Sequence, residues 1–289
     1  QRCHQTMLSI RRSFRAVCFC LRGLPIGVAA LLMAVPALAE DANTGPTQIN
    51  QPASACRTLS VGGADGWEPI SYIRENGQHT GLAIDILRDY AKRHDLRVEV
   101  NLDIPWTRAM QMLGSGELDV IAGAYFTAER NQIHFYSKPF AQDDIMVFQR
   151  RNDQFQVNDL HDLIGYRGAR PQGGSYGDYI DMFAEQRLDM IFSPTGNRIF
   201  DVLLNGRVDY VMLGRFDGLT NIYRDSLSDK ITAIEPPIDS NDVHFLFSRK
   251  SPCMRHVQNL NVLIENMSEN GTLGRWTESH LFDTSEGAS

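Results

Sequence analysis

Residues 116–130 of the chain are Gly116-Glu117-Leu118-Asp119-Val120-Ile121-Ala122-Gly123-Ala124-Tyr125-Phe126-Thr127-Ala128-Glu129-Arg130. The apolar run from Val120 to Ala122 predicts a short buried strand that ends at Gly123. Thr127 is a preferred N-cap residue, so we expect a helix to begin directly after it. Arg130 then lies in the first helical turn, where a cation opposes the helix dipole. Because local rules fail most often at functional sites, Arg130 is either a candidate carboxylate-binding residue or an arginine on a solvated face.

The pattern that leads into this stretch occurs twice. Residues 109–119 predict a helix that is closed by a glycine and followed by an aspartate and a buried strand. Residues 200–209 repeat that order before the apolar run 210–213, which ends at Gly214. Two copies of one helix-to-strand unit predict an α/β protein with two lobes, each a mainly parallel sheet flanked by helices. A ligand is expected between the lobes, at the carboxyl ends of the strands.

The first 39 residues predict a signal peptide. They contain five arginines, no acidic residue, and an apolar run over residues 24–39 that ends in Ala37-Leu38-Ala39. This order predicts cleavage near Ala39/Glu40 and a periplasmic location. Prolines and a glycine interrupt the run, which argues against a membrane anchor. An arginine pair at residues 11–12 leaves Sec and twin-arginine export both open, and residues 40–56 predict a disordered lead-in.

The charge and cysteine content narrow the function classes. The chain has 28 basic and 35 acidic residues, and loss of the five early arginines leaves 23 against 35, a net charge of −12. This balance argues against nucleic acid and anionic membranes as partners. After cleavage only Cys56 and Cys253 remain, and a disulfide and two free thiols are both open. We find no metal-ligand spacing, phosphate loop or dinucleotide fingerprint, so no metal or cofactor is predicted.

Residues 173–177, Gly-Gly-Ser-Tyr-Gly, match the G-x-S-x-G pattern of hydrolase nucleophiles. In that interpretation Ser175 is the nucleophile, and the base is one of three histidines, His244, His256 or His280. However, Pro171 interrupts the strand that would precede the motif, and no His-Gly-Gly segment is present. We favour an anion-binding loop, in which Gly174 and Ser175 present N–H groups and a hydroxyl at a helix N-terminus.

Several further motifs occur in one order along the chain: Trp67-Glu68-Pro69-Ile70-Ser71-Tyr72, Thr80-Gly81-Leu82-Ala83-Ile84-Asp85-Ile86, Phe135-Tyr136-Ser137-Lys138-Pro139-Phe140, Gln172-Gly173-Gly174-Ser175, Asn205-Gly206-Arg207-Val208-Asp209 and Asn270-Gly271-Thr272-Leu273. Together with residues 116–130, they resemble the bacterial extracellular solute-binding proteins of family 3, the periplasmic amino-acid-binding type. The resemblance covers about Thr58 to His280. It implies the type II periplasmic binding fold, with two crossover strands, lobe 1 formed by residues 57–148 and 243–282, and lobe 2 formed by residues 149–242.

The resemblance also implies roles for single residues. Arg130 would bind the carboxylate of the ligand, helped by the backbone at Gly123 and Thr127. Gly174 and Ser175 would contribute from lobe 2. Trp67 would cover one side of the ligand, and Tyr125 and Tyr72 complete the predicted ligand-binding set.

Two positions depart from the family pattern. Tyr125 stands where amino-acid-binding members carry a small hydroxyl residue, and Gly214 stands where they carry the aspartate that receives an α-ammonium group. A buried ammonium without a counter-charge is costly. The ligand is therefore left open among an α-amino acid, another carboxylate, a peptide fragment and another small polar metabolite.

The sequence as a whole predicts a monomeric, non-enzymatic receptor that delivers a small polar ligand to an inner-membrane ABC permease. Two alternatives remain open. One is an enzyme on the same fold, either dehydratase-like or a hydrolase using Ser175. The other is a ligand-sensing input to a separate signalling partner.

Overall fold

The computed structural model describes residues 56–193 and 198–286, and their side chains as far as Leu281. The predicted signal peptide, its cleavage site and residues 40–55 of the lead-in lie outside this part of the chain. Among the described residues, none of the helices has the length and apolar character that crossing a bilayer requires.

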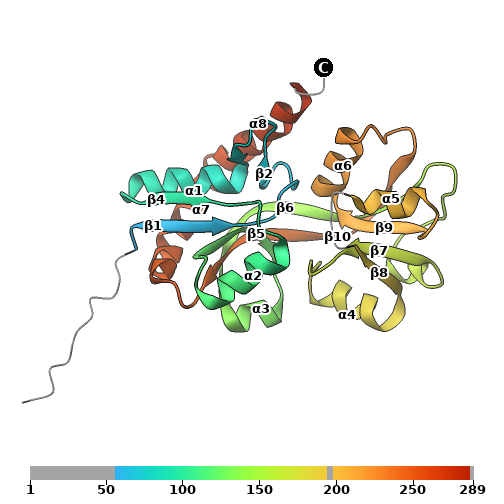
Figure 1. Ribbon diagram of the computed structural model, residues 1–289, viewed down its shortest axis with the longest axis horizontal. Helices are drawn as coiled ribbons and strands as arrows, with labels where there is room; N and C mark the ends of the chain where they lie inside the picture. The colour runs from blue at the N-terminus through green and yellow to red at the C-terminus, as the bar shows by residue number, and fades with distance from the viewer. Residues whose placement is uncertain (1–55, 194–197, 287–289) are drawn as a thin grey trace, which may run out of the picture. The chain divides into compact units, whose positions relative to one another are not determined.

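The centre of the described chain is one eight-stranded sheet (Figure 1). The strand order is β4 (Arg97–Val100), β1 (Thr58–Gly62), β5 (Val120–Tyr125), β10 (Ile231–Ser248), β6 (His134–Arg150), β9 (Tyr210–Gly214), β7 (Arg167–Pro171) and β8 (Asp189–Ser193). The three strands at one end pair in parallel, and so do the three at the other end. β10 and β6 pair antiparallel between them. The sheet thus consists of two parallel halves joined by an antiparallel centre.

The two long strands β6 and β10 connect the halves of the sheet. They contain 17 and 18 residues and pair with each other along most of their length. The register shifts between Ile234 and Asp239, so the ladder is irregular where the strands pass from one half to the other. This arrangement confirms the predicted α/β fold with two lobes and two crossover strands. We call the half with β1, β4 and β5 lobe 1 and the half with β7, β8 and β9 lobe 2, while the residue boundaries of the lobes stay predictions.

Helices cover both faces of each half. In lobe 1, α1 (Leu82–Arg93) and α7 (Val257–Glu269) pack in one apolar cluster, and α2 (Trp106–Ser115) packs on the opposite face. In lobe 2, α4 (Asp178–Arg187) covers one face, whereas α5 (Ile199–Leu204) and α6 (Arg215–Arg224) cover the other. Alternate residues of β9 face the two clusters, as expected of a strand buried on both sides.

The shorter elements are β2 (Tyr72–Ile73), β3 (His79–Thr80), α3 (Ala128–Ile133), and the 3-10 turns Leu160–Leu163 and Pro252–His256. The helix α8 (Thr272–Glu286) ends the described chain.

The repeated helix-to-strand pattern folds as predicted. Gly116 ends α2 with a φ of 89°, a left-handed conformation that glycine adopts without a steric cost. Gly206, which follows α5, has a φ of 66°. After β5, the Thr127 side chain accepts a hydrogen bond from the backbone N–H of Arg130, at 3.1 Å. Thr127 is therefore the N-cap of α3, and Arg130 lies in its first turn.

A disulfide joins Cys56 and Cys253, which settles the alternative that the sequence left open. It ties the start of β1 to the turn before α7 and closes a loop of 197 residues. The last helix is held separately. His280 of α8 is 4% exposed and contacts the Tyr72 hydroxyl at 3.0 Å and an Asp85 carboxylate oxygen at 2.9 Å.

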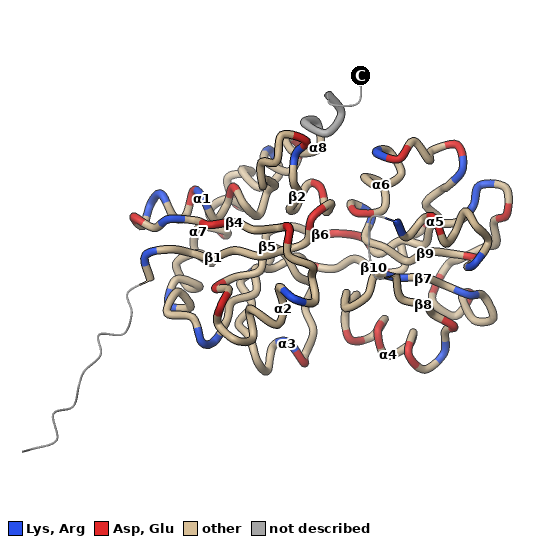
Figure 2. Tube along the Cα trace, in the orientation of Figure 1, with Lys and Arg blue, Asp and Glu red and all other residues tan. Residues whose placement is uncertain are grey.

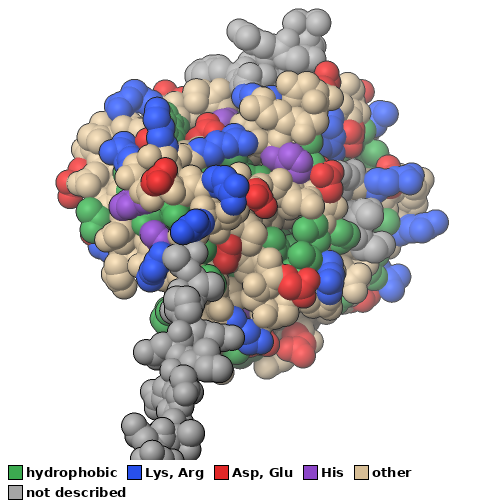
Figure 3. Space-filling model, turned by 60° about the vertical axis from the view of Figure 1, so that its left-hand side comes forward, with side chains coloured by type: hydrophobic (Ala, Val, Ile, Leu, Met, Phe, Trp, Pro, Cys, Tyr) green, Lys and Arg blue, Asp and Glu red, His purple; other side chains and the backbone are tan. Residues whose placement is uncertain are grey.

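Acidic and basic residues are mixed along both lobes (Figure 2). The face shown in Figure 3 likewise carries side chains of both signs next to each other, with hydrophobic side chains in small groups between them. This mixture differs from the continuous basic surface on which nucleic-acid binding depends.

Candidate functional site

A cavity of about 520 Å³ lies between the lobes, at the carboxyl ends of β1, β5, β7 and β9. This is the edge at which open α/β sheets bind ligands. Side chains and backbone from both lobes line it, among them Ala64, Trp67, Trp106, Tyr125 and Arg130 from lobe 1, and Gln172, Gly174, Ser175, Tyr176, Gly214 and Asp217 from lobe 2. Its volume suits a small metabolite.

Arg130 is the only lysine or arginine among the described residues that line this cavity. Its guanidinium lies over the Trp106 ring, with Cζ 5.7 Å from the ring centroid. Nη1 donates to the carbonyl of Tyr125 at 3.4 Å, and Nη2 donates to the carbonyl of Gly173 at 3.5 Å. Both contacts are at the long limit of hydrogen bonds and therefore weak. A carboxylate that entered the cavity would form shorter, charge-assisted bonds with the same fork.

Two aromatic side chains form the wall next to Arg130. The rings of Trp67 and Tyr125 meet edge to face with centroids 5.3 Å apart, a favourable geometry for an aromatic pair. Gly123 allows this packing because a Cβ at that position would lie 2.8 Å from the Trp67 ring, and its φ of 108° suits glycine. The contribution of Gly123 is therefore to admit Trp67 rather than to line the cavity itself.

A buried carboxylate, Asp143 of β6, stands behind these aromatic residues. Its Oδ2 accepts hydrogen bonds from Trp67 Nε1 at 3.0 Å and from the Tyr125 hydroxyl at 2.7 Å. Its Oδ1 accepts from the backbone N–H of Phe216 at 3.2 Å. Burial raises the pKa of Asp143 to about 6, and the three hydrogen bonds oppose this rise.

Asp217 brings a second carboxylate, which lines the cavity itself. It lies in the first turn of α6, three residues after Gly214, and its Oδ1 accepts from the Asn221 side-chain amide at 2.5 Å. Burial raises the pKa of Asp217 to about 7, and the nearby carboxylates of Asp143 and Glu68 add to the rise. Among the described lining residues, the cavity therefore has one arginine, Arg130, in lobe 1, and a carboxylate with a raised pKa, Asp217, in lobe 2. Asp65 and Asp103 of lobe 1 also line it.

The loop around Ser175 is held by Asp181 of α4. The Ser175 hydroxyl donates to Asp181 Oδ2, and the backbone N–H of Tyr176 donates to Oδ1 at 3.1 Å. Arg170 contacts the same carboxylate at 2.9 Å. The Asp181 carboxylate is thus shared between this loop and the Arg170 guanidinium.

The histidines named as possible bases for Ser175 have other partners. His244 contacts the Ser137 carbonyl at 2.8 Å, His256 the Tyr90 hydroxyl at 2.8 Å, and His280 the Tyr72 hydroxyl at 3.0 Å. A nucleophile and its base need to lie within hydrogen-bonding reach of each other. The hydrolase interpretation therefore lacks the serine–histidine pair on which it depends.

Hydrogen bonds also cross between the lobes at the edge of the cavity. Trp106 Nε1 donates to the carbonyl of Gly173 at 2.9 Å. The backbone N–H of Ala128, at the start of α3, donates to the carboxylate of Asp178, at the start of α4, with distances of 3.0 and 3.2 Å. The described conformation is thus one in which the two lobes touch beside the cavity.

The structure brings five of the eight predicted ligand-binding residues to the cavity lining: Trp67, Tyr125, Arg130, Gly174 and Ser175. Gly123 and Thr127 are not among the residues that line it: Gly123 packs against Trp67, and Thr127 caps α3. Tyr72 is 3% exposed and contacts His280, so it lies apart from the cavity lining.

Sequence reasoning missed the two carboxylates. Asp217 had a readable signal, because it lies one helical turn beyond Gly214, the position at which this chain lacks the aspartate of the family pattern. Asp143 had none, since nothing in the sequence indicates that a side chain of the long crossover strand turns toward residue 214.

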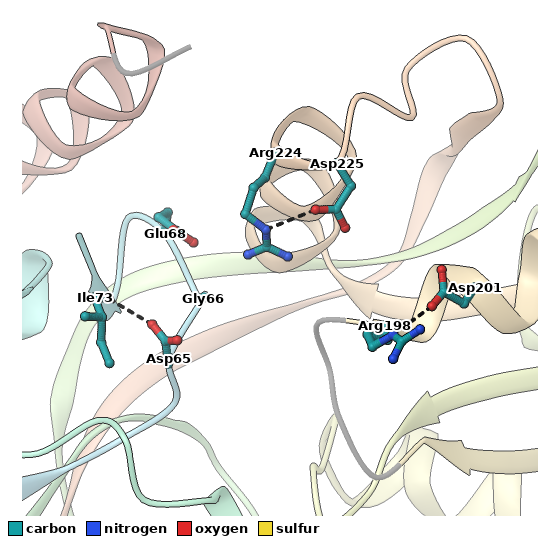
Figure 4. A pocket seen from close by; sticks show the side chains of 8 residues that line it. All are labelled: Asp65, Gly66, Glu68, Ile73, Arg198, Asp201, Arg224 and Asp225. Atoms are coloured by element: carbon teal, nitrogen blue, oxygen red, sulfur yellow. Dashed lines mark hydrogen bonds and ion pairs between the residues drawn. The ribbon is translucent and has the colours of Figure 1, made fainter. Parts of the chain in front are cut away.

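A second cavity, of about 590 Å³, opens between the loop after β1 and the helices α5 and α6 (Figure 4). Charged side chains dominate its lining: Asp65, Glu68, Arg198, Asp201, Arg224 and Asp225. Both arginines are paired within lobe 2, Arg198 with Asp201 at 3.0 Å and Arg224 with Asp225 at 3.2 Å. Because its cations are already paired and the described residues of its lining include no tryptophan or tyrosine, this cavity suits an anionic or aromatic-stacked ligand less well than the first.

In the part of the chain that the structure describes, no group of three or more histidine, cysteine or acidic side chains is arranged to hold a metal ion.

Comparison with known proteins identifies the class. The family model of the bacterial extracellular solute-binding proteins, family 3, matches residues 59–283, and the chain belongs to this family. Among curated relatives, the probable amino-acid-binding protein YxeM of Bacillus subtilis is 23% identical over 225 residues, which is 77% of this chain and 83% of YxeM.

Solved structures with the same fold include the following two. One is a histidine kinase sensor domain with similarity to periplasmic binding proteins, with a TM-score of 0.69, 21% identity, and coverage of 78% of this chain and 96% of the other. The second is an ancestral arginine-binding protein bound to arginine, with a TM-score of 0.67, 20% identity, and coverage of 78% and 98%. At these identities the likeness shows the fold and leaves the ligand open.

Proposed function

We propose that this protein is a non-enzymatic periplasmic receptor that closes its lobes around a small solute bearing a carboxylate, and that Arg130 binds this carboxylate. The observation that carries the proposal is the position of Arg130. Its guanidinium enters the cavity between the lobes as the only lysine or arginine of the described lining, over the Trp106 ring and with long hydrogen bonds to two carbonyls. An arginine in such a place gains little from its present partners and much from a bidentate carboxylate.

The same solute carries a cationic group in this proposal, and Asp217 receives it. The carboxylate of Asp217 lines the cavity from lobe 2, and the buried Asp143 adds negative potential behind it. Ionised Asp217 is costly in a partly buried site unless a cation pairs with it, which is the role of a solute ammonium or guanidinium group. An amino acid satisfies both ends, and the name of YxeM agrees with that class.

Family membership supports delivery of the solute to an inner-membrane ABC permease by a monomeric, exported receptor. The match to a family of extracellular solute-binding proteins also supports the periplasmic location that the signal-peptide pattern predicts. The Ser175 loop favours binding over hydrolysis, because its hydroxyl is held by a carboxylate that is itself paired with Arg170.

The test starts from the protein as it is exported. Mature protein is purified without added solute and denatured, and the released small molecules are identified by mass spectrometry. Titration calorimetry then compares the affinities for L-arginine, L-cystine and L-glutamine, which carry a carboxylate and a cationic group, with the affinity for succinate, which carries carboxylates only. We expect binding of at least one amino acid and much weaker binding of succinate, which has no cationic group. Tight binding of succinate alone, or of a neutral sugar, would overturn the proposal.

A further inference from the structure

Asp143 lies where the crossover strand β6 passes between the lobes, and its carboxylate contacts both of them. From lobe 1 it accepts hydrogen bonds from the Trp67 indole N–H at 3.0 Å and from the Tyr125 hydroxyl at 2.7 Å. From lobe 2 it accepts one from the backbone N–H of Phe216, in the first turn of α6, at 3.2 Å. The side chain is 1% exposed. A single carboxylate thus joins two cavity-lining aromatic residues to the helix that carries Asp217.

The Asp143 carboxylate occupies space that a side chain at residue 214 would otherwise fill, and Gly214 leaves this space free. A Cβ on Gly214 would lie 2.4 Å from Asp143 Oδ2 and 2.7 Å from the Tyr125 hydroxyl oxygen, both shorter than real Cβ contacts. Any side chain at residue 214 would therefore displace Asp143 or Tyr125. The glycine and the aspartate are two parts of one arrangement, in which the crossover strand supplies a carboxylate where β9 supplies none.

We propose that Asp143 is the positioning residue of the solute site: in its ionised form it fixes Trp67 and Tyr125 of lobe 1 against α6 of lobe 2. The proposal deepens the proposed function, because the walls that Asp143 orders are those of the solute cavity. We call the hydrogen bonds from Trp67, Tyr125 and Phe216 to Asp143 the tie between the lobes. The tie exists in the protein without solute, so it can be tested without one.

The hydrogen bonds explain why the charge matters. An ionised carboxylate accepts all three hydrogen bonds, whereas a protonated one carries an O–H that must itself donate. Protonation therefore displaces one of the three donors or turns the Tyr125 hydroxyl into an acceptor. In either case the bonds between the lobes weaken, and Trp67 is the side chain whose surroundings change most directly.

The neighbouring charged groups do not replace this role. Asp144, the next residue, is paired with Arg215 at 3.0 Å, and Arg215 also pairs with Glu235 at 2.9 Å. The other titratable groups that face Asp143 are Tyr125 of β5, Asp217 of α6 and Tyr176 of the loop before α4. Glu68, beside Trp67, acts on Asp217. The pKa of both tyrosines is raised by burial, so they stay neutral over the pH range that matters here.

The first experiment follows the indole N–H resonance of Trp67 by two-dimensional NMR of the solute-free mature protein between pH 4.5 and 8. The chain has three tryptophans, and Trp67→Phe assigns the signal. Burial sets the pKa of Asp143 at about 6, so we expect the Trp67 resonance to shift with a midpoint close to that pH. Asp143→Asn should abolish the shift, whereas Asp217→Asn and Glu68→Gln should preserve it. A pH-independent Trp67 resonance, or an unchanged midpoint in Asp143→Asn, would overturn the proposal.

The second experiment moves the carboxylate from β6 back to β9. Gly214→Asp alone should disturb Trp67 and Tyr125, because its Cβ has no room. Asp143→Ala should lose the pH-dependent shift. The double variant Asp143→Ala/Gly214→Asp should recover both the native Trp67 resonance and its titration, since the new carboxylate fills the vacated space. Melting curves identify variants that fail to fold, and a folded double variant that resembles Asp143→Ala would count against the proposal.

Solute binding separates this proposal from the proposed function. With L-arginine as the probe, Asp143→Asn should weaken binding by about tenfold or more at pH 8, the loss expected when a charged hydrogen-bond acceptor becomes neutral. If no amino acid binds the parent protein but Trp67 titrates with Asp143, the solute class fails and the tie stands. If L-arginine binds parent and Asp143→Asn equally well at all pH values, Asp143 does not position the site.

Discussion

Asp178, the first residue of α4 in lobe 2, accepts a hydrogen bond from the backbone N–H of Ala128, the first residue of α3 in lobe 1. The N–H groups of a first helical turn have no partners within the helix, and the helix dipole favours an anion there. The Thr127 side chain satisfies one such N–H, that of Arg130, from within lobe 1. Asp178 satisfies another from the opposite lobe, and this contact forms only while the lobes are closed on that side.

Replacing Asp178 should therefore favour the open state. We expect Asp178→Ala to weaken solute binding by about threefold to tenfold, since an exposed charge-assisted contact contributes roughly 1 kcal/mol. The affinity change should be mainly in the dissociation rate, which stopped-flow fluorescence measures. Asp189→Ala, an exposed aspartate of lobe 2 that pairs with Arg167 within that lobe, is the matched control. Equal dissociation rates for parent and Asp178→Ala would show that the contact has no part in closure.

Arg130 is the residue on which the proposed solute site depends most. Once a solute is known, Arg130→Ala and Arg130→Lys should both lose about 2–5 kcal/mol of binding, roughly 30-fold to several thousand-fold in affinity. Lysine fails because an ammonium group cannot form the two parallel bonds of a guanidinium. The solute-free melting temperature should change little, as the present contacts of Arg130 are 3.4 and 3.5 Å long.

Titration calorimetry measures the affinities, and Arg108→Ala provides the control. Arg108 is an exposed arginine of the same lobe that pairs with Glu117 at 3.5 Å. If Arg130→Ala keeps the parental affinity, the carboxylate is bound elsewhere or the solute has none.

The sequence was sufficient for the architecture because the fold rests on local signals that repeat. Gly116, Thr127 and the buried run of β5 each obey a backbone or burial rule that a few neighbouring residues determine. Arg130 was selected as a candidate because it breaks such a rule. These signals act within one turn or one strand, which is the range over which a sequence can be read directly.

The remaining features of the site depend on contacts between distant segments. Asp143 meets Trp67 across 76 positions, and its fit against Gly214 follows from how β6 and β9 pair in the sheet. Tyr72 was included in the predicted ligand-binding set through the family resemblance, yet its hydroxyl contacts His280, 208 positions further along the chain. Cys56 and Cys253 were left undecided for the same reason, since pairing over 197 positions has no local signature.

The Cys56–Cys253 disulfide should stabilise the folded state by restricting the unfolded chain. For so long a loop the chain-entropy model gives roughly 4–5 kcal/mol at most. We expect reduction, or the variant Cys56→Ser/Cys253→Ser, to lower the free energy of unfolding by up to that amount in urea titrations. Dithiothreitol should destabilise the parent and leave the double variant unchanged. An unchanged parent under reducing conditions would mean that the bond restricts the unfolded state very little.

Asp217 should make solute binding and stability respond to pH in opposite directions. Burial raises its pKa from the ordinary value of 3.8 to about 7, so the folded state binds the proton more tightly than the unfolded state. The free energy of unfolding should therefore fall as the pH rises from about 4 to about 7, and Asp143, with a pKa of about 6, acts in the same direction. Asp217→Asn resembles the protonated form, so urea titrations should show it to be more stable than the parent at pH 8, by on the order of 1–3 kcal/mol, and nearly equal at pH 4.

A solute ammonium or guanidinium group needs the ionised carboxylate, so the affinity of the parent for a cationic amino acid should rise over the same pH interval, and Asp217→Asn should bind it weakly throughout. Exposed Asp229→Asn serves as the control for a general effect of charge removal. If Asp217→Asn gains stability at pH 8 and loses solute binding, the protein keeps a destabilising carboxylate because the solute neutralises it. If parent and variant have equal stability and equal affinity, Asp217 contributes neither to the pH dependence of stability nor to solute binding.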